Sequence, residues 1–349
     1  KILRKLRREF SGHADVFRIS GLNALHNNKS SDAIKFVKTA ILLAPESIEL
    51  TDLLGTALME NGQFAAAESV YRKVLLEHPQ KPGPLNNLGN ALRQNGKLSE
   101  AVFCYEKSLE FRPGHESTLL NLADVLHQLT NFTQAEEVYK NILSQGTAEP
   151  SVYVNLSSTL LSQRKYEEAL RCCEDGIAKV GDHSLLYYNR AYILGAAGKL
   201  RESEECLNAL LAIDPNHARA RQDLSIHHFL NSRWQLGWEA YEARWLVGDL
   251  QRRPFMQETW NGEKLKGKRI LIWGEQGAGD EIMFVSMLPD LLKEDCEILF
   301  ETDPRLIPLF ERSLPAIKWL AKSDPPSKEA LSKSIDFQCS SGSIGRFLR

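Results

Sequence analysis

The stretch LNNLGNALRQNGKLSEAVFCYEKSLEFRPG, Leu85 to Gly114, contains two runs of helical spacing with a turn signal between them. Apolar residues recur three and four positions apart on both sides of Asn95-Gly96, a dipeptide that favours a turn. Pro113 follows the second run, and proline cannot continue a helix. The stretch therefore predicts a pair of antiparallel helices.

The same pattern returns every 34 residues, so the helix pair is one unit of a repeat. Small residues mark two positions and a helix breaker or small polar residue marks a third. The first position holds Gly21, Gly55, Gly89, Ala123, Ser157 and Ala191, the second Ala33, Ala67, Ala101, Ala135, Ala169 and Ser203, and the third Pro45, Pro79, Pro113, Thr147, Gly181 and Pro215. Helices approach closely only where the facing side chains are small. We expect six matched hairpins and a degenerate seventh, in which Ser225 and Gly237 keep the register and Asp249 stands at the third position.

The period and the small–small–proline order resemble the tetratricopeptide repeat (TPR) family. Tyrosines four residues after the second small position add to the resemblance: Tyr71, Tyr105, Tyr139 and Tyr241. Such arrays form a superhelix whose concave groove, lined by the first helix of each pair, binds a polypeptide or protein partner. The expected fold is an α-helical TPR solenoid of about seven hairpins over residues 14–250, after a basic helical lead-in at residues 1–13.

Asparagines recur two residues before the first small position: Asn87, Asn121, Asn155 and Asn189. An amide offers a donor and an acceptor together, so such a row could clamp the main chain of an extended peptide. O-GlcNAc transferases, which this array resembles, use an asparagine ladder at the corresponding position. Asparagine is also common there among TPR sequences in general, so a purely structural role is the alternative. Ile19 and Leu53 replace it in the first two repeats.

Composition and charge narrow the possible functions. The chain is 43% hydrophobic and 25% charged, as soluble globular proteins are, and it has no run of about 18 apolar residues and no signal peptide. A cytoplasmic protein without a membrane span is expected. The net charge of −2 indicates no nucleic-acid partner. The basic start, Lys1 to Arg8, is interpreted as a solvated helix, with contact to nucleic acid or anionic lipid as the alternative.

Six scattered cysteines lack the spacing of metal ligands, so reduced thiols and no metal site are expected. No feature indicates an oligomeric state. At the end of the repeats, Trp234, Trp238, Tyr241 and Trp245 share one helix face. This stripe predicts a cap that packs against the next domain, and a platform for a sugar is the alternative. A connecting segment follows at residues 251–266.

Residues 267–349 change to a β-α-β pattern. KRILIW (268–273), CEILFET (296–302) and residues 335–339 are strand candidates, with helical spacing at 281–294 and 304–313 and a further apolar run at AIKWLA (316–321). The alternation predicts a parallel sheet covered by helices, as part of a Rossmann-like α/β domain. This is about half of a doubly wound domain, and the chain has no initial Met, so we expect a fragment of a longer protein.

The stretch GEQGAGDE, residues 274–281, has the glycine spacing of a phosphate-binding loop. Asp280 and Glu281 stand where lysine and serine or threonine should be, and two acids would repel a triphosphate. A dinucleotide fingerprint fits poorly because Ile282 occupies the third glycine position, although Glu301 ends the second strand as a ribose-binding acid would. An aspartate at the carboxyl end of the first strand could instead accept a proton from a substrate. A tight turn with a helix N-cap is the structural alternative.

The order W-x-x-G-W-x-x-Y-E-x-R-W (234–245), T-W-N-G, strand and E-Q-G-x-G-D resembles bacterial TPR proteins fused to a heptosyltransferase-like GT-B glycosyltransferase domain. The resemblance implies that Asp280 is a catalytic base and that Gln276, Gly277 and Gly279 shape the acceptor-binding mouth. It also implies a nucleotide-sugar donor held mainly by a second α/β domain that this chain does not include. The expected function is a protein glycosyltransferase, inactive in this fragment and without a cofactor in the chain. A non-catalytic TPR protein–protein interaction scaffold with an α/β cap is the alternative.

Overall fold

The computed structural model describes residues 2–248, 250–275 and 277–349. Its contacts group into two compact units, Lys1–Ile193 and Leu194–Arg349. The sequence predicts a change from repeat to α/β structure after residue 250, and the contacts place the last repeat helices in the same unit as the sheet. No helix in the described ranges has the length and apolarity to cross a membrane.

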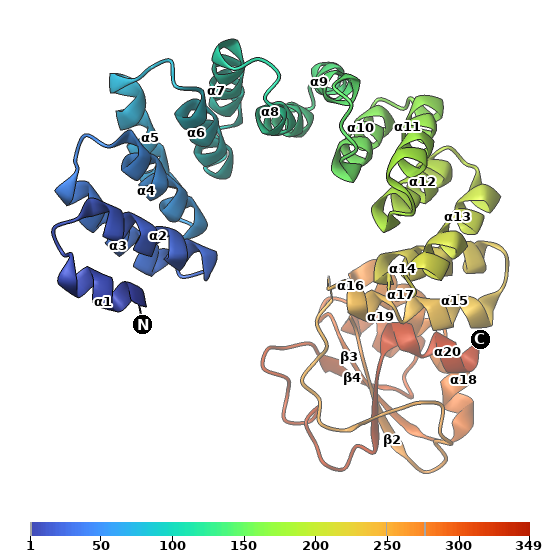
Figure 1. Cartoon of the computed structure of the whole chain (residues 1–349). Helices are drawn as coiled ribbons and strands as arrows, with labels where there is room; N and C mark the ends of the chain where they lie inside the picture. Colours follow the sequence, from blue (N-terminus) through green and yellow to red (C-terminus); the bar gives the residue numbers. More distant parts are fainter. Residues whose placement is uncertain (1, 249, 276) are drawn as a thin grey trace. The chain divides into compact units, whose positions relative to one another are not determined.

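The first unit is built from antiparallel helix pairs (Figure 1). Its helices are α1 (Ile2–Glu9), α2 (Ala14–His26), α3 (Ser30–Leu43), α4 (Ile48–Glu60), α5 (Phe64–Glu77), α6 (Pro82–Gln94), α7 (Leu98–Phe111), α8 (Glu116–Gln128), α9 (Phe132–Ser144), α10 (Pro150–Ser162), α11 (Tyr166–Val180) and α12 (Ser184–Ala196), which ends in the second unit. Within this unit, α4, α6, α8 and α10 line the inner side of the curve and α5, α7, α9 and α11 the outer side (Figure 1). The predicted hairpins are confirmed.

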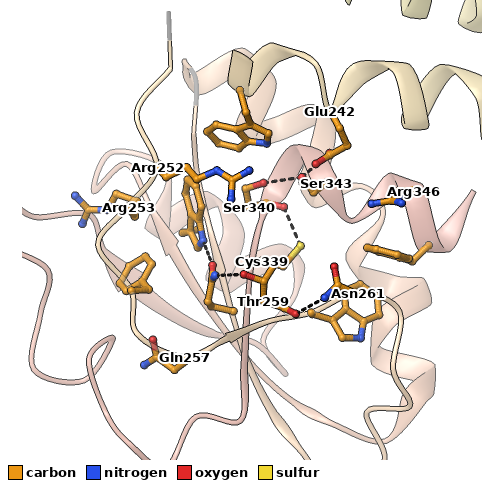
Figure 2. A pocket seen from close by; sticks show the side chains of 16 residues that line it. Glu242, Arg252, Arg253, Gln257, Thr259, Asn261, Cys339, Ser340, Ser343 and Arg346 are labelled. Atoms are coloured by element: carbon orange, nitrogen blue, oxygen red, sulfur yellow. Dashed lines mark hydrogen bonds between the residues drawn. The ribbon is translucent and has the colours of Figure 1, made fainter. Parts of the chain in front are cut away.

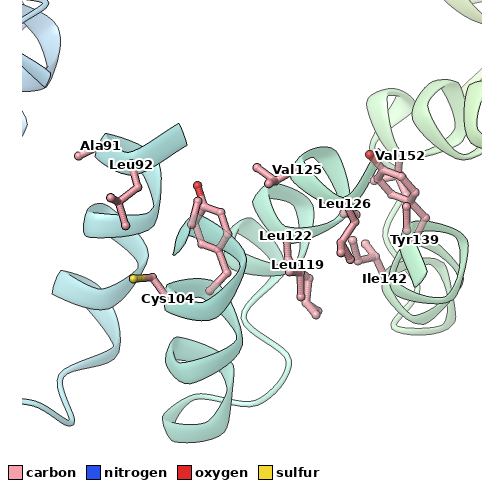
Figure 3. Packing of buried hydrophobic residues seen from close by; sticks show 14 of the residues in the cluster. Ala91, Leu92, Cys104, Leu119, Leu122, Val125, Leu126, Tyr139, Ile142 and Val152 are labelled. Atoms are coloured by element: carbon pink, nitrogen blue, oxygen red, sulfur yellow. The ribbon is translucent and has the colours of Figure 1, made fainter. Parts of the chain in front are cut away.

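The close approach of paired helices occurs where a small residue faces a recurring tyrosine. A Cβ added at Gly89 would lie 2.5 Å from the ring of Tyr105, and one added at Gly55 would lie 2.3 Å from the ring of Tyr71. Both rings are buried. Figure 3 shows buried side chains from neighbouring pairs, which belong to one apolar cluster that runs through the unit. A larger residue at the first small position would therefore displace the ring that fills the space between the helices.

A second contact recurs every 68 residues, which is twice the repeat length. It therefore occurs in every second repeat and joins that repeat to the next one. A glutamate next to the second small residue accepts hydrogen bonds from an amide 27 residues later and from a cation 29 residues later. The three sets are Glu68 with Asn95 and Lys97, Glu136 with Gln163 and Lys165, and Glu204 with Asn231 and Arg233. Each set ties a second helix to the turn of the following hairpin.

Glu136 is the most strongly perturbed of these carboxylates. Its Oε2 accepts from Lys165 Nζ at 2.8 Å and from Gln163 Nε2 at 2.7 Å, and its Oε1 accepts from Lys140 Nζ at 2.5 Å. Burial alone would raise the pKa of Glu136, but the hydrogen bonds from the two lysines and the glutamine lower it from 4.5 to about 2. The contact therefore stabilises the fold wherever the glutamate is ionised.

We expect Glu136→Gln to destabilise the first unit by about 1 to 3 kcal/mol at neutral pH, because it removes a charge that three partners solvate. A folded-state pKa below the unfolded value contributes stability above about pH 4.5 and loses it as the pH falls toward about 2. The difference between the two proteins should therefore shrink with acidification. Urea titrations followed by circular dichroism at several pH values measure it. The neighbouring exposed Glu137→Gln should change stability by less than about 0.5 kcal/mol, and equal effects would contradict the assignment.

The second unit combines the last repeat helices with a parallel sheet. After the end of α12 come α13 (Leu200–Ile213), α14 (Ala218–Leu230), α15 (Trp234–Tyr241), α16 (Arg244–Val247), β1 (Glu258–Thr259), β2 (Arg269–Trp273), α17 (Ala278–Val285), α18 (Leu288–Leu291), a 3₁₀ turn (Leu292–Glu294), β3 (Glu297–Thr302), α19 (Ile307–Ser313), β4 (Lys318–Ala321), β5 (Phe337–Ser340), a second 3₁₀ turn (Ser341–Ser343) and α20 (Gly345–Leu348). The strand order is β1-β5-β2-β3-β4, and all pairs are parallel. The predicted small parallel sheet is confirmed.

Different apolar clusters pack against the two faces of the sheet. Ile270, Ile272 and Phe300 face a large apolar cluster that includes residues of α17, α18 and α19. Leu271 and Leu299 point to the other face, because side chains alternate along a strand, and they contact a smaller cluster with residues 255, 330 and 335. The segment predicted as a connection, 251–266, therefore contributes the edge strand β1 and part of this second cover.

The aromatic stripe packs against the α/β part, as predicted for a cap. The Trp238 and Tyr241 rings lie 6.3 and 6.4 Å from the ring of Phe284. The Trp245 ring lies 5.7 Å from the ring of Trp273, at the end of β2. Trp234 does not take part in this way, since it is half exposed and lies beside Phe229.

A buried arginine fastens α16 to the carboxyl ends of two strands. The Arg244 side chain is fully buried, and its three nitrogens donate hydrogen bonds of 2.6 to 3.2 Å. Its acceptors are both carboxylate oxygens of Glu275, Glu242 Oε1, Ser340 Oγ, Ser343 Oγ and the Tyr241 carbonyl. Burial would lower the pKa of Arg244, but the hydrogen bonds and charges of Glu275 and Glu242 hold it above its ordinary value. The guanidinium of Arg244 therefore remains charged inside the unit.

We expect Arg244→Met to destabilise the second unit by roughly 3 to 5 kcal/mol, because it leaves the Glu275 carboxylate buried without its partner. All six tryptophans lie between residues 234 and 319, so a urea titration followed by tryptophan fluorescence reports on this unit. Removing both partners in Arg244→Met/Glu275→Leu should recover part of the loss.

The matched control is Arg305→Met, which breaks an ion pair of a largely exposed arginine with Asp303. It should cost at most about 1 kcal/mol. An Arg244→Met variant no less stable than this control would show that the buried pair does not hold α16 to the sheet.

Candidate functional site

The four predicted asparagines lie on the first helices of consecutive repeats, and all four are half-buried. Each amide nitrogen donates a hydrogen bond to the first helix of the preceding repeat, at 2.6 to 3.2 Å. The acceptors are Asp52 for Asn87, Asn86 for Asn121, Asp124 for Asn155, and Val154 O and Ser157 Oγ for Asn189. The asparagines therefore form a polar seam between neighbouring inner helices.

The side-chain oxygens of the four asparagines differ in whether they accept a hydrogen bond within the protein. Asn87 Oδ1 accepts from Asn86 Nδ2 at 3.3 Å. Those of Asn121, Asn155 and Asn189 accept no hydrogen bond from any residue that the structure describes. Because a carbonyl oxygen accepts from N–H groups, three acceptors spaced by one repeat each are left for a ligand.

Asp124 on α8 contacts three polar side chains. Its Oδ1 accepts from the Tyr139 hydroxyl at 2.6 Å and from Asn155 Nδ2 at 3.0 Å, and its Oδ2 lies 3.6 Å from Arg93 Nη1. Burial and the Asp124 charge raise the pKa of Tyr139, so the phenol remains a donor. These contacts fix the orientation of the carboxylate.

A pocket of about 220 Å³ opens beside this carboxylate and is lined also by His127 and Ser158. His127 Nδ1 lies 2.9 Å from Thr159 Oγ1. Burial lowers the pKa of His127 below 6.5, so the ring is neutral at neutral pH. The pocket can therefore exchange hydrogen bonds with a small polar group of a bound peptide.

The glycine loop leads into α17, whose N-cap is Gly277. Gln276 lies outside the described residues. Gly277 and Gly279 are exposed, and a Cβ added at either would meet nothing within 4 Å. Gly277 has a φ of −79°, which any residue can adopt. Neither backbone geometry nor internal packing explains why these two positions are glycine.

Asp280 sits in the first turn of α17 and is half-buried, with its backbone N–H bonded to Gly277 O at 3.0 Å. Its side chain has no hydrogen-bond partner in the part of the chain that the structure describes. A carboxylate so placed can accept a proton from a ligand, provided that one reaches it. The structure thus brings Asp280, Gly277 and Gly279 together on one turn, whereas the asparagine seam belongs to the other unit.

The two other acids singled out by sequence have structural partners. Glu281 is buried, and its Oε2 accepts from the Thr302 hydroxyl and from the Asp303 N–H. Glu301 is fully buried in a bidentate pair with Arg253, at 2.7 and 3.0 Å. A carboxylate bound in this way is not open to a ribose, which removes the remaining feature of the dinucleotide fingerprint.

The crevice at the switch point of the sheet is occupied by the protein itself. Strands β2, β3 and β4 run outward in one direction while β5 crosses to the other side of β2, so the order reverses between β2 and β5. Ligands of open α/β sheets bind outside the carboxyl ends of the strands at this point. Here Arg244 binds there, between Glu275 after β2 and Ser340 at the end of β5.

The six cysteines, all within the described ranges, form no disulfide bond, and five of them are buried. Among residues 2–248, 250–275 and 277–349, no group of three or more His, Cys, Asp and Glu side chains could hold a metal ion.

Sequence reasoning missed Arg244 and Glu275. Their only sequence signal was that each lies inside a motif used for the family resemblance, and their pairing joins positions 31 residues apart. It also missed the glutamates spaced by 68 residues, which a search for charges at twice the repeat length would have found.

Three segments match models of the tetratricopeptide repeat: residues 84–115, 151–179 and 185–217. Protein FlbA of Caulobacter vibrioides is 32% identical over 158 residues, which are 42% of this chain. The chain spans only 26% of the length of FlbA. These matches lend no support to a glycosyltransferase interpretation of the α/β part.

Two solved structures share the fold of the helical part. A tetratricopeptide repeat protein from Parabacteroides merdae has a TM-score of 0.56 at 17% identity, covering 67% of this chain and 93% of its own. The C-terminal part of a TPR repeat-containing protein from Cytophaga hutchinsonii has a TM-score of 0.54 at 14% identity, covering 66% and 95%. The sequence models and these structures together show that the chain contains tetratricopeptide repeats.

Proposed function

We propose that this chain is a protein-binding TPR scaffold. The inner helices of the first unit bind an extended polypeptide, and the α/β part covers the last repeat helices. The observation that carries the proposal is the row of half-buried side-chain oxygens of Asn121, Asn155 and Asn189, whose amide nitrogens are held by the preceding repeat.

The fixed nitrogens explain how the row would work. Since each amide is oriented by a bond within the protein, its oxygen is presented without loss of side-chain freedom when a ligand binds. Three such acceptors can pair with main-chain N–H groups, which every peptide offers at regular intervals. The row would therefore hold a peptide backbone, and the pocket beside Asp124 would add a preference for a small polar side chain.

The test is selection of binding peptides from a displayed random library on the purified chain, followed by titration of a selected peptide. Each single change among Asn121→Ala, Asn155→Ala and Asn189→Ala should weaken binding about two- to tenfold, as expected for one neutral hydrogen bond.

The matched control is Asn86→Ala, which removes the acceptor of Asn121 in the seam and leaves the Asn121 oxygen in place. It should weaken binding less than Asn121→Ala does, because the Asn121 oxygen is still present and only its fixed orientation is lost. A library that yields no peptide, or a triple asparagine variant that binds as the parent does, would refute the proposal.

A second candidate is sugar transfer to the bound polypeptide. It is favoured by the half-buried Asp280 on the first turn after β2, without a side-chain partner among the described residues. In this candidate Asp280 is the base, Gln276, Gly277 and Gly279 shape the acceptor mouth, and a nucleotide-sugar is the donor. The Arg244 pair in the switch-point crevice weighs against it, since that crevice is where a ligand would otherwise enter.

This candidate requires a longer protein in which a second α/β domain follows the chain. There, Asp280→Asn should slow transfer about 10²- to 10⁴-fold relative to Asp290→Asn, because general base catalysis contributes factors of that order. Equal rates in a sugar-transfer assay would eliminate Asp280 as the base. Residues 1–349 alone should transfer no sugar, and calorimetry with nucleoside diphosphates would show whether the longer protein binds a donor.

A further inference from the structure

A cavity of about 250 Å³ lies beside strands β1 and β5 in the second unit (Figure 2). Trp273 and Gln338 line it from the sheet, and Trp245 and Arg252 line it from α16 and the segment that follows. Asp280 and the glycines of its loop are not among its lining residues. The cavity is therefore separate from the turn considered for sugar transfer.

One wall of the cavity is aromatic. The Trp245 and Trp273 rings lie 5.7 Å apart, and the Phe255 ring lies 6.2 Å from that of Trp273. Trp260 and Phe347 form a second ring pair at 4.8 Å. Flat faces of this size bind planar or ring-shaped ligands by stacking and by excluding water.

The cavity also carries positive charge without a matching negative charge. The Arg252 guanidinium lies 5.3 Å over the Trp245 ring and points inward in Figure 2. Within the described ranges, no carboxylate lies within ion-pair distance of Arg252 or of Arg346, which also lines the cavity. Arg253 differs, because it points away in Figure 2 and is paired with the buried Glu301.

The acid of the cavity, Glu242, shares a buried arginine with a second carboxylate. Glu242 Oε1 accepts from Arg244 Nη1 at 2.8 Å and from Ser343 Oγ at 2.7 Å. Arg244 also pairs with Glu275, so this buried cluster carries one net negative charge, which the two guanidinium groups of Arg252 and Arg346 outweigh. Two exposed arginines remain to attract an anion.

The lining is fixed in position. Trp273 Nε1 donates to Gln338 Oε1 and Gln338 Nε2 donates to Thr259 Oγ1, both at 2.8 Å. The amide nitrogen of Gln257 donates to the carbonyls of Ala330 and Ser332, which fixes the orientation of that amide. These bonds hold Gln338 and Gln257 in place at the edge of the cavity.

We infer that this cavity binds a small organic anion, in which a single ring carries a phosphate or carboxylate group. The ring packs against the tryptophan wall, and the anionic group binds Arg252 and Arg346. A volume of about 250 Å³ lies below the range of roughly 300 to 1,000 Å³ of drug-sized pockets, which fits one ring and its substituent. Neither proposed function uses this site.

The test is calorimetric titration of the whole chain with phenyl phosphate and with 4-hydroxybenzoate. Saturable binding of either supports the site, and the tighter of the two identifies the anionic group. Inorganic phosphate carries only the anionic group, and phenol carries only the ring with its hydroxyl. Each should bind at least about tenfold more weakly than the tighter probe.

Arg252→Gln should weaken the tighter probe about tenfold or more, the effect expected for the loss of a charge-assisted hydrogen bond. Arg312→Gln, which changes an exposed arginine of the same unit outside the cavity, should leave the affinity unchanged. Both side chains are exposed, so neither change should unfold the protein. The inference is overturned if neither probe saturates below about 10 mM, if inorganic phosphate binds as tightly as phenyl phosphate, or if the two arginine variants behave alike.

Discussion

The contact between a small residue and a buried tyrosine determines the helical part of this protein. The space between paired helices is set by the ring, and the opposite position has no room for a Cβ at Gly55 and Gly89. A close contact of the same kind stands at Gly21, where Val37 replaces the tyrosine, so consecutive hairpins of the first unit pack in a similar way. The inner helices then present equivalent positions to one side, which is the condition for a row of identical side chains to act together on one ligand.

Two polar seams hold the hairpins in register, and they have different consequences for binding. The glutamate contacts tie second helices to following turns and use charge, so they resist sliding of one hairpin on the next. The asparagine seam joins first helices through amide nitrogens, and at Asn121, Asn155 and Asn189 it leaves the amide oxygen without a donor among the described residues. A seam that leaves acceptors available can contribute to packing and to recognition at once. For this reason the structural and the peptide-clamping interpretations of the asparagines are compatible.

Much of the fold could be predicted from sequence because its signals are periodic and local. The helix pairs followed from a fixed period, and the strands β2, β3 and β5 from short apolar runs. Strand β1 could not be predicted, since Glu258 and Thr259 are polar and exposed and become a strand only through main-chain bonds to β5. Arg244 looked like a surface charge within an aromatic helix. It is buried because its acceptors come from segments 31 and more than 90 residues away, which no local pattern reveals.

The buried arginine also explains why ligand chemistry in the α/β part would lie away from the switch point. Arg244 fills the crevice in which open parallel sheets commonly bind ligands. Its guanidinium forms ion pairs with Glu275 and Glu242. Glu242 and Glu275 share Arg244, so this cluster keeps one net negative charge, and the two guanidinium groups of Arg252 and Arg346 make the neighbouring cavity net positive. The positive charge that remains accessible is on Arg252, beside the tryptophans that the same helix and strand β2 supply. The interaction that attaches the α/β part to the last repeat helices thus also sets the electrostatic character of the cavity beside it.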